Sequence, residues 1–148
     1  MKRFNYILII SLFILDRIIK EAVKYKNIVL IANILSISYV ENSGIAFGFM
    51  NRYNNNIILI NLILIILLFI YLSGMNITSR KDFIYSSFIL AGSIGNIIDR
   101  LFYGYVIDYI SILDFPIFNL ADIYIVFGLL LLFIEINRVG ECANIWKY

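Results

Sequence analysis

The sequence predicts a membrane protein, mainly α-helical and of a single domain over residues 1–148, with four transmembrane helices and strand structure at the membrane surface. Hydrophobic residues make up 62% of the chain, and the mean hydropathy is +0.91. A soluble domain is about 45–50% apolar. A small core cannot hide this surplus, so we expect lipid to cover much of the surface.

Four apolar segments predict the helices. Each has an apolar core of about 16 residues, or about 24 Å of helix, which is short for a hydrocarbon layer of about 30 Å. Polar residues at the segment ends should therefore lie near the interfaces. Although Lys2 and Arg3 precede the first segment as in a secretion signal, charged residues and no small-residue cleavage site follow it, so we expect a retained helix. The predicted spans are 4–20, 57–73, 83–99 and 120–137.

A fifth apolar run, Ile28–Val40, is too short for a comfortable crossing. It is rich in isoleucine and valine, and its ISISYV stretch alternates with the period of a strand. We therefore expect strand structure in a surface segment over residues 24–55.

Four spans place both termini on one side of the membrane. Lysines and arginines divide equally between the two sides, but on the side of the termini they stand in short segments, which favours the cytoplasmic face. The end of the first helix, the start of the second, the end of the third and the start of the fourth then meet at the outer surface.

Composition excludes several kinds of site. The chain has no histidine, so it has no Ser-His-Asp or Cys-His relay and no histidine metal site. Its single cysteine, Cys142, forms no internal disulfide, and we expect no role for it. A net charge of +2 with scattered basic residues does not indicate nucleic-acid binding.

Two acids beside the last helix, Asp108 and Asp122, are candidates for chemistry. Taken singly, Asp122 could be an acid favoured by the helix dipole and Asp108 a solvated loop residue. If they converge, they should hold one proton between them. The ionised acid could then activate water while the protonated acid polarises a carbonyl, which would hydrolyse a peptide bond. Asp114 ranks below them because it stands in a predicted surface turn.

Other motifs have structural explanations as well. Ala91 and Gly95 permit close helix packing. Asn96 and Arg100, four residues apart, share a helix face, although Asp99 and Arg100 could simply anchor the helix at the interface. The NSG of ENSGIAFGF is a turn signal, and the acid–base pair of DRIIK could stabilise a helix end.

Together these motifs resemble one family, the bacterial lipoprotein signal peptidases, or signal peptidase II. The family pattern is D-Q-x-x-K, N-x-G-x-A-F, G-N-x-x-D-R, V-x-D-F and F-N-x-A-D, in that order. Across nearly the whole chain, this sequence has DRIIK from Asp16, NSGIAF from Asn42, GNIIDR from Gly95, VIDY from Val106 and FNLAD from Phe118.

The resemblance implies a membrane aspartyl endopeptidase that removes signal peptides from diacylglyceryl-modified prolipoproteins, cutting just before the lipidated cysteine. It implies four helices with a small extracytoplasmic sheet and arm, in the bacterial cytoplasmic membrane. No cofactor or metal is implied; the partners are the prolipoprotein and membrane lipids, and we expect a monomer. The implied catalytic pair is Asp108 and Asp122; the substrate-binding residues are Asn42, Gly44, Asn96, Arg100 and Asn119; the supporting residues are Asp16, Lys20 and Asp99.

Three departures stand out: Arg17 in place of glutamine, Tyr109 in place of phenylalanine, and AGSIGN in place of a more glycine-rich start. The sequence also leaves other readings open. Intramembrane acids can line an ion or proton path in a small transporter or channel. A membrane scaffold and a serine–lysine peptidase using Ser43 and Lys20 are further alternatives.

Overall fold

The computed structural model describes residues 2–43, 63 and 80–145. Within them, helices α1 (Lys2–Val23), α3 (Arg80–Tyr103) and α4 (Leu120–Ile145) cover the predicted spans 4–20, 83–99 and 120–137. The predicted span 57–73 lies outside the described residues, apart from Ile63. Over the described part of the chain, neither α1, α3 nor α4 combines the length and the apolar character needed for a membrane-crossing helix.

Helix α3 ends through a glycine. Gly104 has a φ of 81°, in the left-handed region, and its N–H donates to the carbonyl of Arg100 at 3.1 Å. This is the bond of an αL cap, which satisfies a carbonyl that the last turn would leave free. The charged residues of GNIIDR therefore lie inside the helix, near its end.

Helices α3 and α4 pack closely because small residues line their contact. A Cβ added at Gly92 would lie 2.3 Å from the carbonyl oxygen of Ala121, and one added at Gly128 would lie 2.7 Å from that of Tyr85. The predicted pair Ala91 and Gly95 is also buried in α3. Gly92, which stands between Ala91 and Gly95 in the sequence, is therefore the residue that lets the start of α4 approach α3.

Three strands occur in the described residues, and they form one antiparallel sheet in the order β1-β2-β3. Strand β1 (Asn27–Ile31) and β2 (Leu35–Asn42) form a hairpin, which confirms the predicted strand structure. Asn33, with a φ of 58°, lies in its turn. Strand β3 (Val106–Ile112), which contains VIDY, was not predicted from the residues.

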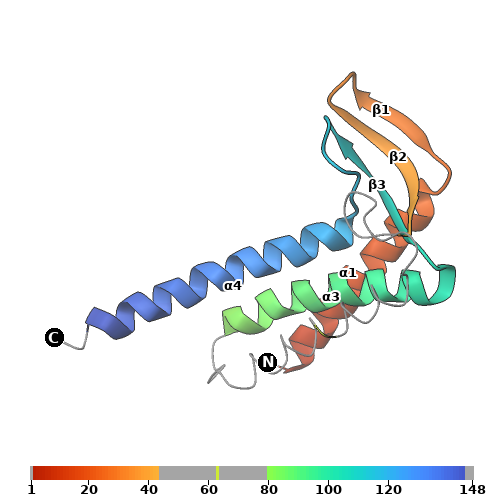
Figure 1. Ribbon diagram of the computed structural model, residues 1–148. Helices are drawn as coiled ribbons and strands as arrows, with labels where there is room; N and C mark the ends of the chain where they lie inside the picture. Colours follow the sequence, from red (N-terminus) through yellow and green to blue (C-terminus); the bar gives the residue numbers. More distant parts are fainter. Residues whose placement is uncertain (1, 44–62, 64–79, 146–148) are drawn as a thin grey trace.

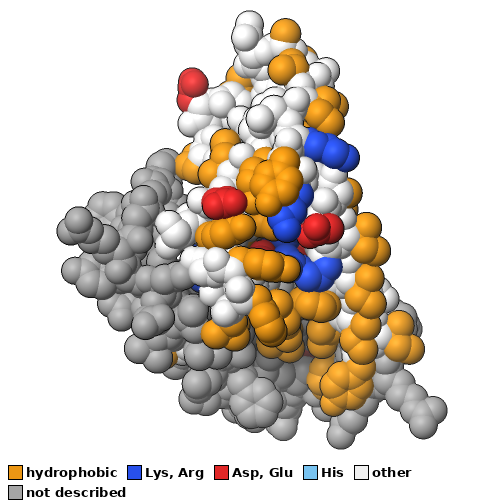
Figure 2. All heavy atoms as spheres, turned by 90° about the vertical axis from the view of Figure 1, so that its right-hand side faces the viewer, with side chains coloured by type: hydrophobic (Ala, Val, Ile, Leu, Met, Phe, Trp, Pro, Cys, Tyr) orange, Lys and Arg blue, Asp and Glu red, His pale blue; other side chains and the backbone are white. Residues whose placement is uncertain are grey.

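The sheet lies at one end of the helices. Figure 1 shows the end of α1, the end of α3 and the start of α4 meeting at its base, whereas the start of α1 and the end of α4 lie away from it. Every residue of β1 is exposed, including Val29 at 71% and Leu30 at 56%. Seen from this end, acidic and basic side chains gather in the middle of the face, with hydrophobic side chains around them (Figure 2).

A short connection joins β3 to α4. The N–H groups of Tyr109 and Ile110 donate to the carbonyl of Phe118 at 3.0 and 2.8 Å, and the N–H of Phe118 returns to Ile110 at 3.1 Å. These bonds fold the chain back on β3. The residue after Phe118 therefore comes to lie beside the acid of β3.

Candidate active site

Asp108 lies on β3 and is almost completely buried, with 2% of its surface exposed. Each carboxylate oxygen accepts one amide N–H: Oδ2 from Asn42 at 2.7 Å and Oδ1 from Asn119 at 2.6 Å. Asn42 pairs with Val106 across the sheet, and residues two apart on a strand share a face, so Asn42 reaches Asp108 diagonally.

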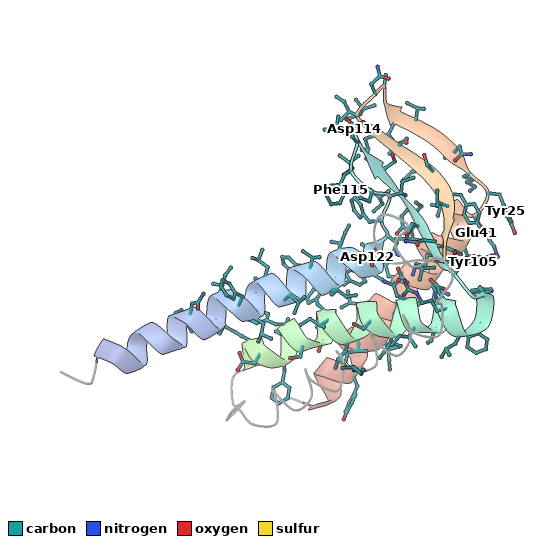
Figure 3. The ribbon with its side chains drawn as sticks, viewed as in Figure 1. Tyr25, Glu41, Tyr105, Asp114, Phe115 and Asp122 are labelled. Atoms are coloured by element: carbon teal, nitrogen blue, oxygen red, sulfur yellow. The ribbon has the colours of Figure 1, made fainter. Side chains whose placement is uncertain are left out.

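Asp122 lies in the first turn of α4 and is partly exposed. Its backbone N–H donates to Oδ1 of Asn119 at 2.9 Å, while its Oδ2 accepts the N–H of Asn119 at 3.2 Å. This reciprocal pair is a capping box, which satisfies two free donors at a helix start. Figure 3 shows Asp122 where α4 begins, at the base of the sheet.

Asn96 connects α3 to this pair. Its amide nitrogen donates to Oδ1 of Asp122 at 2.7 Å, and its carbonyl accepts from Asn119 at 3.3 Å and from Lys20 at 3.1 Å. The structure thus brings Asp108 and Asp122 together through Asn119, which bonds to both. The motifs that supply these residues lie far apart in the sequence.

Behind Asn96 lies a buried ionic cluster of α1 and α3. The ammonium of Lys20 is 2.9 Å from Asp16 and 2.8 Å from Asp99, and all three residues are 0–1% exposed. Arg17 lies 2.5 Å from Asp99 and 3.8 Å from Asp16. Its contact with Asp99 is an ion pair rather than a directed hydrogen bond.

The remaining predicted residues are placed as follows. Arg100, in the last turn of α3, interacts electrostatically with Asp122, Asp108 and Asp99. Gly44 lies outside the described residues. Asp114 is exposed in the turn after β3, at the far end of the sheet from Asp122 (Figure 3). It therefore lies apart from the two candidate acids.

Sequence reasoning missed two roles at this site. Tyr109 is 3% exposed, and its hydroxyl accepts the N–H of Leu120 at 3.2 Å, one of the free donors at the start of α4. Arg17 is the partner of Asp99, where the family pattern has a glutamine. In the sequence, Arg17 and Tyr109 stand out only as departures from the family pattern, and no neighbouring residue in the sequence indicates their partners.

The electrostatics of Asp108 follow from its surroundings. The pKa of Asp108 is raised from 3.8 to about 6: burial raises it most and the nearby charge of Asp122 adds to the increase, whereas the amides of Asn42 and Asn119 and the charge of Lys20 oppose it. Burial dominates because it penalises the charged form. Within the described residues, no three potential metal-ligating acids or cysteines lie together.

The fold resembles that of solved membrane enzymes. Two structures described as bacterial membrane enzymes, determined by the in meso method, superpose with TM-scores of 0.81 and 0.78 at 26% identity each. They cover 91% and 90% of this chain, and the chain covers 88% and 92% of theirs. The class defined by this fold is a bacterial membrane enzyme.

Sequence comparisons show which family of bacterial membrane enzymes this chain resembles. The family model for "Signal peptidase (SPase) II" matches residues 8–138. A lipoprotein signal peptidase of Clostridium novyi (strain NT) is 37% identical over 145 residues, covering 91% of this chain and 98% of that protein. One of Clostridium tetani (strain Massachusetts / E88) is 40% identical over 143 residues, covering 89% and 91%. The chain therefore belongs to the signal peptidase II family, and it is a hydrolase of the aspartic-peptidase type, which confirms the resemblance.

Proposed function

We propose that this chain cleaves the signal peptide from diacylglyceryl-modified prolipoproteins, just before the lipidated cysteine, with Asp108 and Asp122 activating water. The relatives named lipoprotein signal peptidases support the substrate. The observation that carries the mechanism is the position of Asn119, which donates to Asp108 from its side chain and to Asp122 from its backbone.

The two acids differ in ways that suit different roles. Burial raises the pKa of Asp108 to about 6, so Asp108 takes up a proton more readily than an ordinary carboxyl, and in its protonated form it can donate to the carbonyl oxygen of the scissile bond. Asp122 is partly exposed and stands at a helix start, where the dipole favours an anion. We therefore assign Asp122 as the base that takes a proton from water.

The polar residues around the pair fit substrate binding. Asn42, Asn96 and Asn119 hold the acids through their amide nitrogens, and a peptide backbone entering the site would meet the same amides. Arg100 lies near both acids, and its guanidinium suits a phosphate or carbonyl oxygen at the interface. Gly44 completes the proposed binding residues on the sequence pattern alone.

The arrangement of the chain supports a site at the outer membrane surface, with four spans and both termini in the cytoplasm. Asp16, Lys20 and Asp99, which lower the mean hydropathy of α1 and α3, are buried and paired, so they do not face lipid. The sheet and the ionic cluster lie at one end of the helices, and the start of α1 and the end of α4 lie away from them (Figure 1).

The test is cleavage of a synthetic lipid-modified prolipoprotein by the reconstituted protein, with products identified by mass. Asp108→Asn and Asp122→Asn should each abolish cleavage, while Asp114→Asn, an exposed acid of the same segment, should cleave at the wild-type rate. Cleavage by either of the first two variants would remove the dyad mechanism. Proton flux through liposomes, lost in the same variants, would favour a transporter instead.

The orientation can be tested with cysteines placed in a Cys142→Ser background. Asp114→Cys, on the exposed turn of the sheet, should react with a membrane-impermeant maleimide on intact cells. Lys81→Cys, exposed at the start of α3, should react only after lysis. The reverse labelling pattern would invert the proposed topology.

A further inference from the structure

The Asn96 amide faces two different partners at its two ends. Its carbonyl oxygen accepts from the ammonium of Lys20 at 3.1 Å, and its nitrogen donates to Asp122 at 2.7 Å. An ammonium has donors and no acceptor, so only the carbonyl end of an amide can face it favourably. Lys20, together with the amide nitrogen of Asn119 at 3.3 Å, therefore holds the carbonyl end of Asn96 and leaves its nitrogen for Asp122.

Lys20 itself is held firmly. Its side chain is 1% exposed, and its ammonium donates hydrogen bonds to Asp99 at 2.8 Å and to Asn96 at 3.1 Å, while it forms an ion pair with Asp16 at 2.9 Å. This engagement also argues against the serine–lysine alternative with Ser43.

Arg17 adds a second cation to the cluster. Lys20 and Arg17 both lie within ion-pair distance of Asp16 and Asp99, and Arg100 also interacts electrostatically with Asp99. Because Arg17 pairs with Asp99, one ammonium does not have to neutralise two buried acids alone. A buried acid without a partner would be costly. Arg17 therefore shares with Lys20 the neutralisation of the two buried acids.

We propose that Lys20 is a positioning residue that acts through Asn96, turning its amide N–H toward Asp122. The inference rests on the proposed function, in which Asp122 is the catalytic base. Asn119 is turned in the same manner, because the backbone N–H of Asp122 faces its carbonyl and leaves its nitrogen for Asp108. Asp122 thus accepts from the amide of Asn96, whose carbonyl faces the ammonium of Lys20, and Asp108 accepts from the amide of Asn119, whose carbonyl faces the backbone N–H of Asp122. An ammonium and a backbone N–H can donate but cannot accept, so each favours the carbonyl end of its amide.

The consequence for catalysis is specific. A reversed Asn96 amide would place a carbonyl oxygen against the Asp122 carboxylate, and the acid would move from its bonded position. Lys20→Met should therefore lower kcat by about 10²-fold, the cost of misplacing a reacting group by about 1 Å, and leave KM for the lipidated prolipoprotein unchanged. Lys26→Met, the same change at an exposed lysine, should keep the wild-type kcat.

A double-mutant cycle tests whether Lys20 acts through Asn96. The losses of kcat in Lys20→Met and Asn96→Ala should not multiply in the double variant, because both remove the same oriented N–H. A second variant, Asp16→Asn/Lys20→Met, removes one acid together with the ammonium and keeps the ion pair of Arg17 and Asp99. This charge-balanced variant should show the same loss of kcat as Lys20→Met and should keep wild-type thermal stability.

The proposal is wrong if the charge-balanced variant keeps kcat within about twofold of wild type, or if the losses multiply as for independent sites. Asp108→Asn, assayed in the same experiment, distinguishes a failure of the proposed role of Lys20 from a failure of the proposed function. Cleavage by Asp108→Asn would refute the dyad, whereas an inactive Asp108→Asn with multiplying losses would refute only the role of Lys20.

Discussion

Asn119 and Asp122 cap each other across the first turn of α4, with N–H···O distances of 2.9 and 3.2 Å. The same three-residue step that starts the helix also positions the second candidate acid. Since the carbonyl of Asn119 is used by the cap, its amide nitrogen is left for Asp108 at 2.6 Å. Helix initiation and the assembly of the acid pair thus share one side chain.

Asn119→Ser should separate these two functions. Serine keeps an oxygen for the helix cap but lacks the amide donor to Asp108. We expect near wild-type thermal stability in detergent and a loss of cleavage of about 10²-fold, as for removal of one well-placed donor. Asn119→Ala, which loses both, should also lose about 0.5–2 kcal/mol of stability. Wild-type kcat in Asn119→Ser would show that the amide bond to Asp108 has no catalytic role.

Tyr109→Phe should destabilise the protein modestly and preserve cleavage. The variant restores the family residue, but it removes the acceptor for the N–H of Leu120 at 3.2 Å. A lost hydrogen bond costs about 0.5–1.5 kcal/mol, measurable by chemical or thermal unfolding in detergent. Tyr25→Phe, at a residue 75% exposed, is the matched control and should be neutral. Equal stability of the two variants would contradict a role for the Tyr109 hydroxyl.

Gly92→Ala should weaken the packing of α3 against α4. The new methyl group would lie 2.3 Å from the carbonyl oxygen of Ala121, and overpacking costs about 1–3 kcal/mol, which exceeds the helix propensity that alanine gains. Gly95→Ala, whose nearest contact would be Asp16 at 3.0 Å, should be milder. The unfolding temperatures of the two variants measure the difference, and a reversed order would place the tight contact elsewhere.

The stability of the protein should depend on the protonation of Asp108. Its pKa is about 6 in the folded protein and 3.8 in the reference state, so between these values the unfolded chain has lost a proton that the folded chain keeps. The contribution of Asp108 to stability is therefore complete below about pH 4 and is lost as the pH rises through about 6.

Unfolding measured from pH 4.5 to 7.5 tests this sign. The wild type should lose stability relative to Asp108→Asn as the pH rises, because the asparagine does not titrate. Asp114→Asn, altered on the exposed turn, should follow the wild-type curve. Parallel curves for the wild type and Asp108→Asn would exclude a raised pKa.

In the described part of the chain, the helices were predictable because each contains an apolar run of about 16 residues, which is too long for a typical strand although short for a membrane crossing. Within the described residues, three predicted spans lie inside α1, α3 and α4, and the alternating ISISYV lies in β2. Strand β3 was not predicted, because VIDYISI is a short segment that carries an acid, Asp108, among its apolar residues. The ends of α3 and α4 extend beyond the apolar segments, since hydropathy does not register a glycine cap or a polar helix tail.

The gathering of the polar motifs at one end of the helices was also predictable from motif order. Their partners were not: Lys20 meets Asn96 and Asp99 across 76 and 79 residues of sequence. Asp16 and Lys20 looked like a local helix pair, and only the structure adds Arg17 and Asp99 to them. The roles of these residues in catalysis stay predictions.

The return of the chain from Phe118 to β3 has a mechanical consequence. Asp108, Asn119 and Asp122 all belong to one continuous segment, tied into a closed loop by its own backbone bonds. If α1 and α3 tilt away from α4 to admit a bulky acylated chain from the bilayer, this loop travels as a unit with α4. The spacing of the two acids would then survive the opening, and the contacts broken and remade would include the two hydrogen bonds of Asn96, to Asp122 and to Asn119.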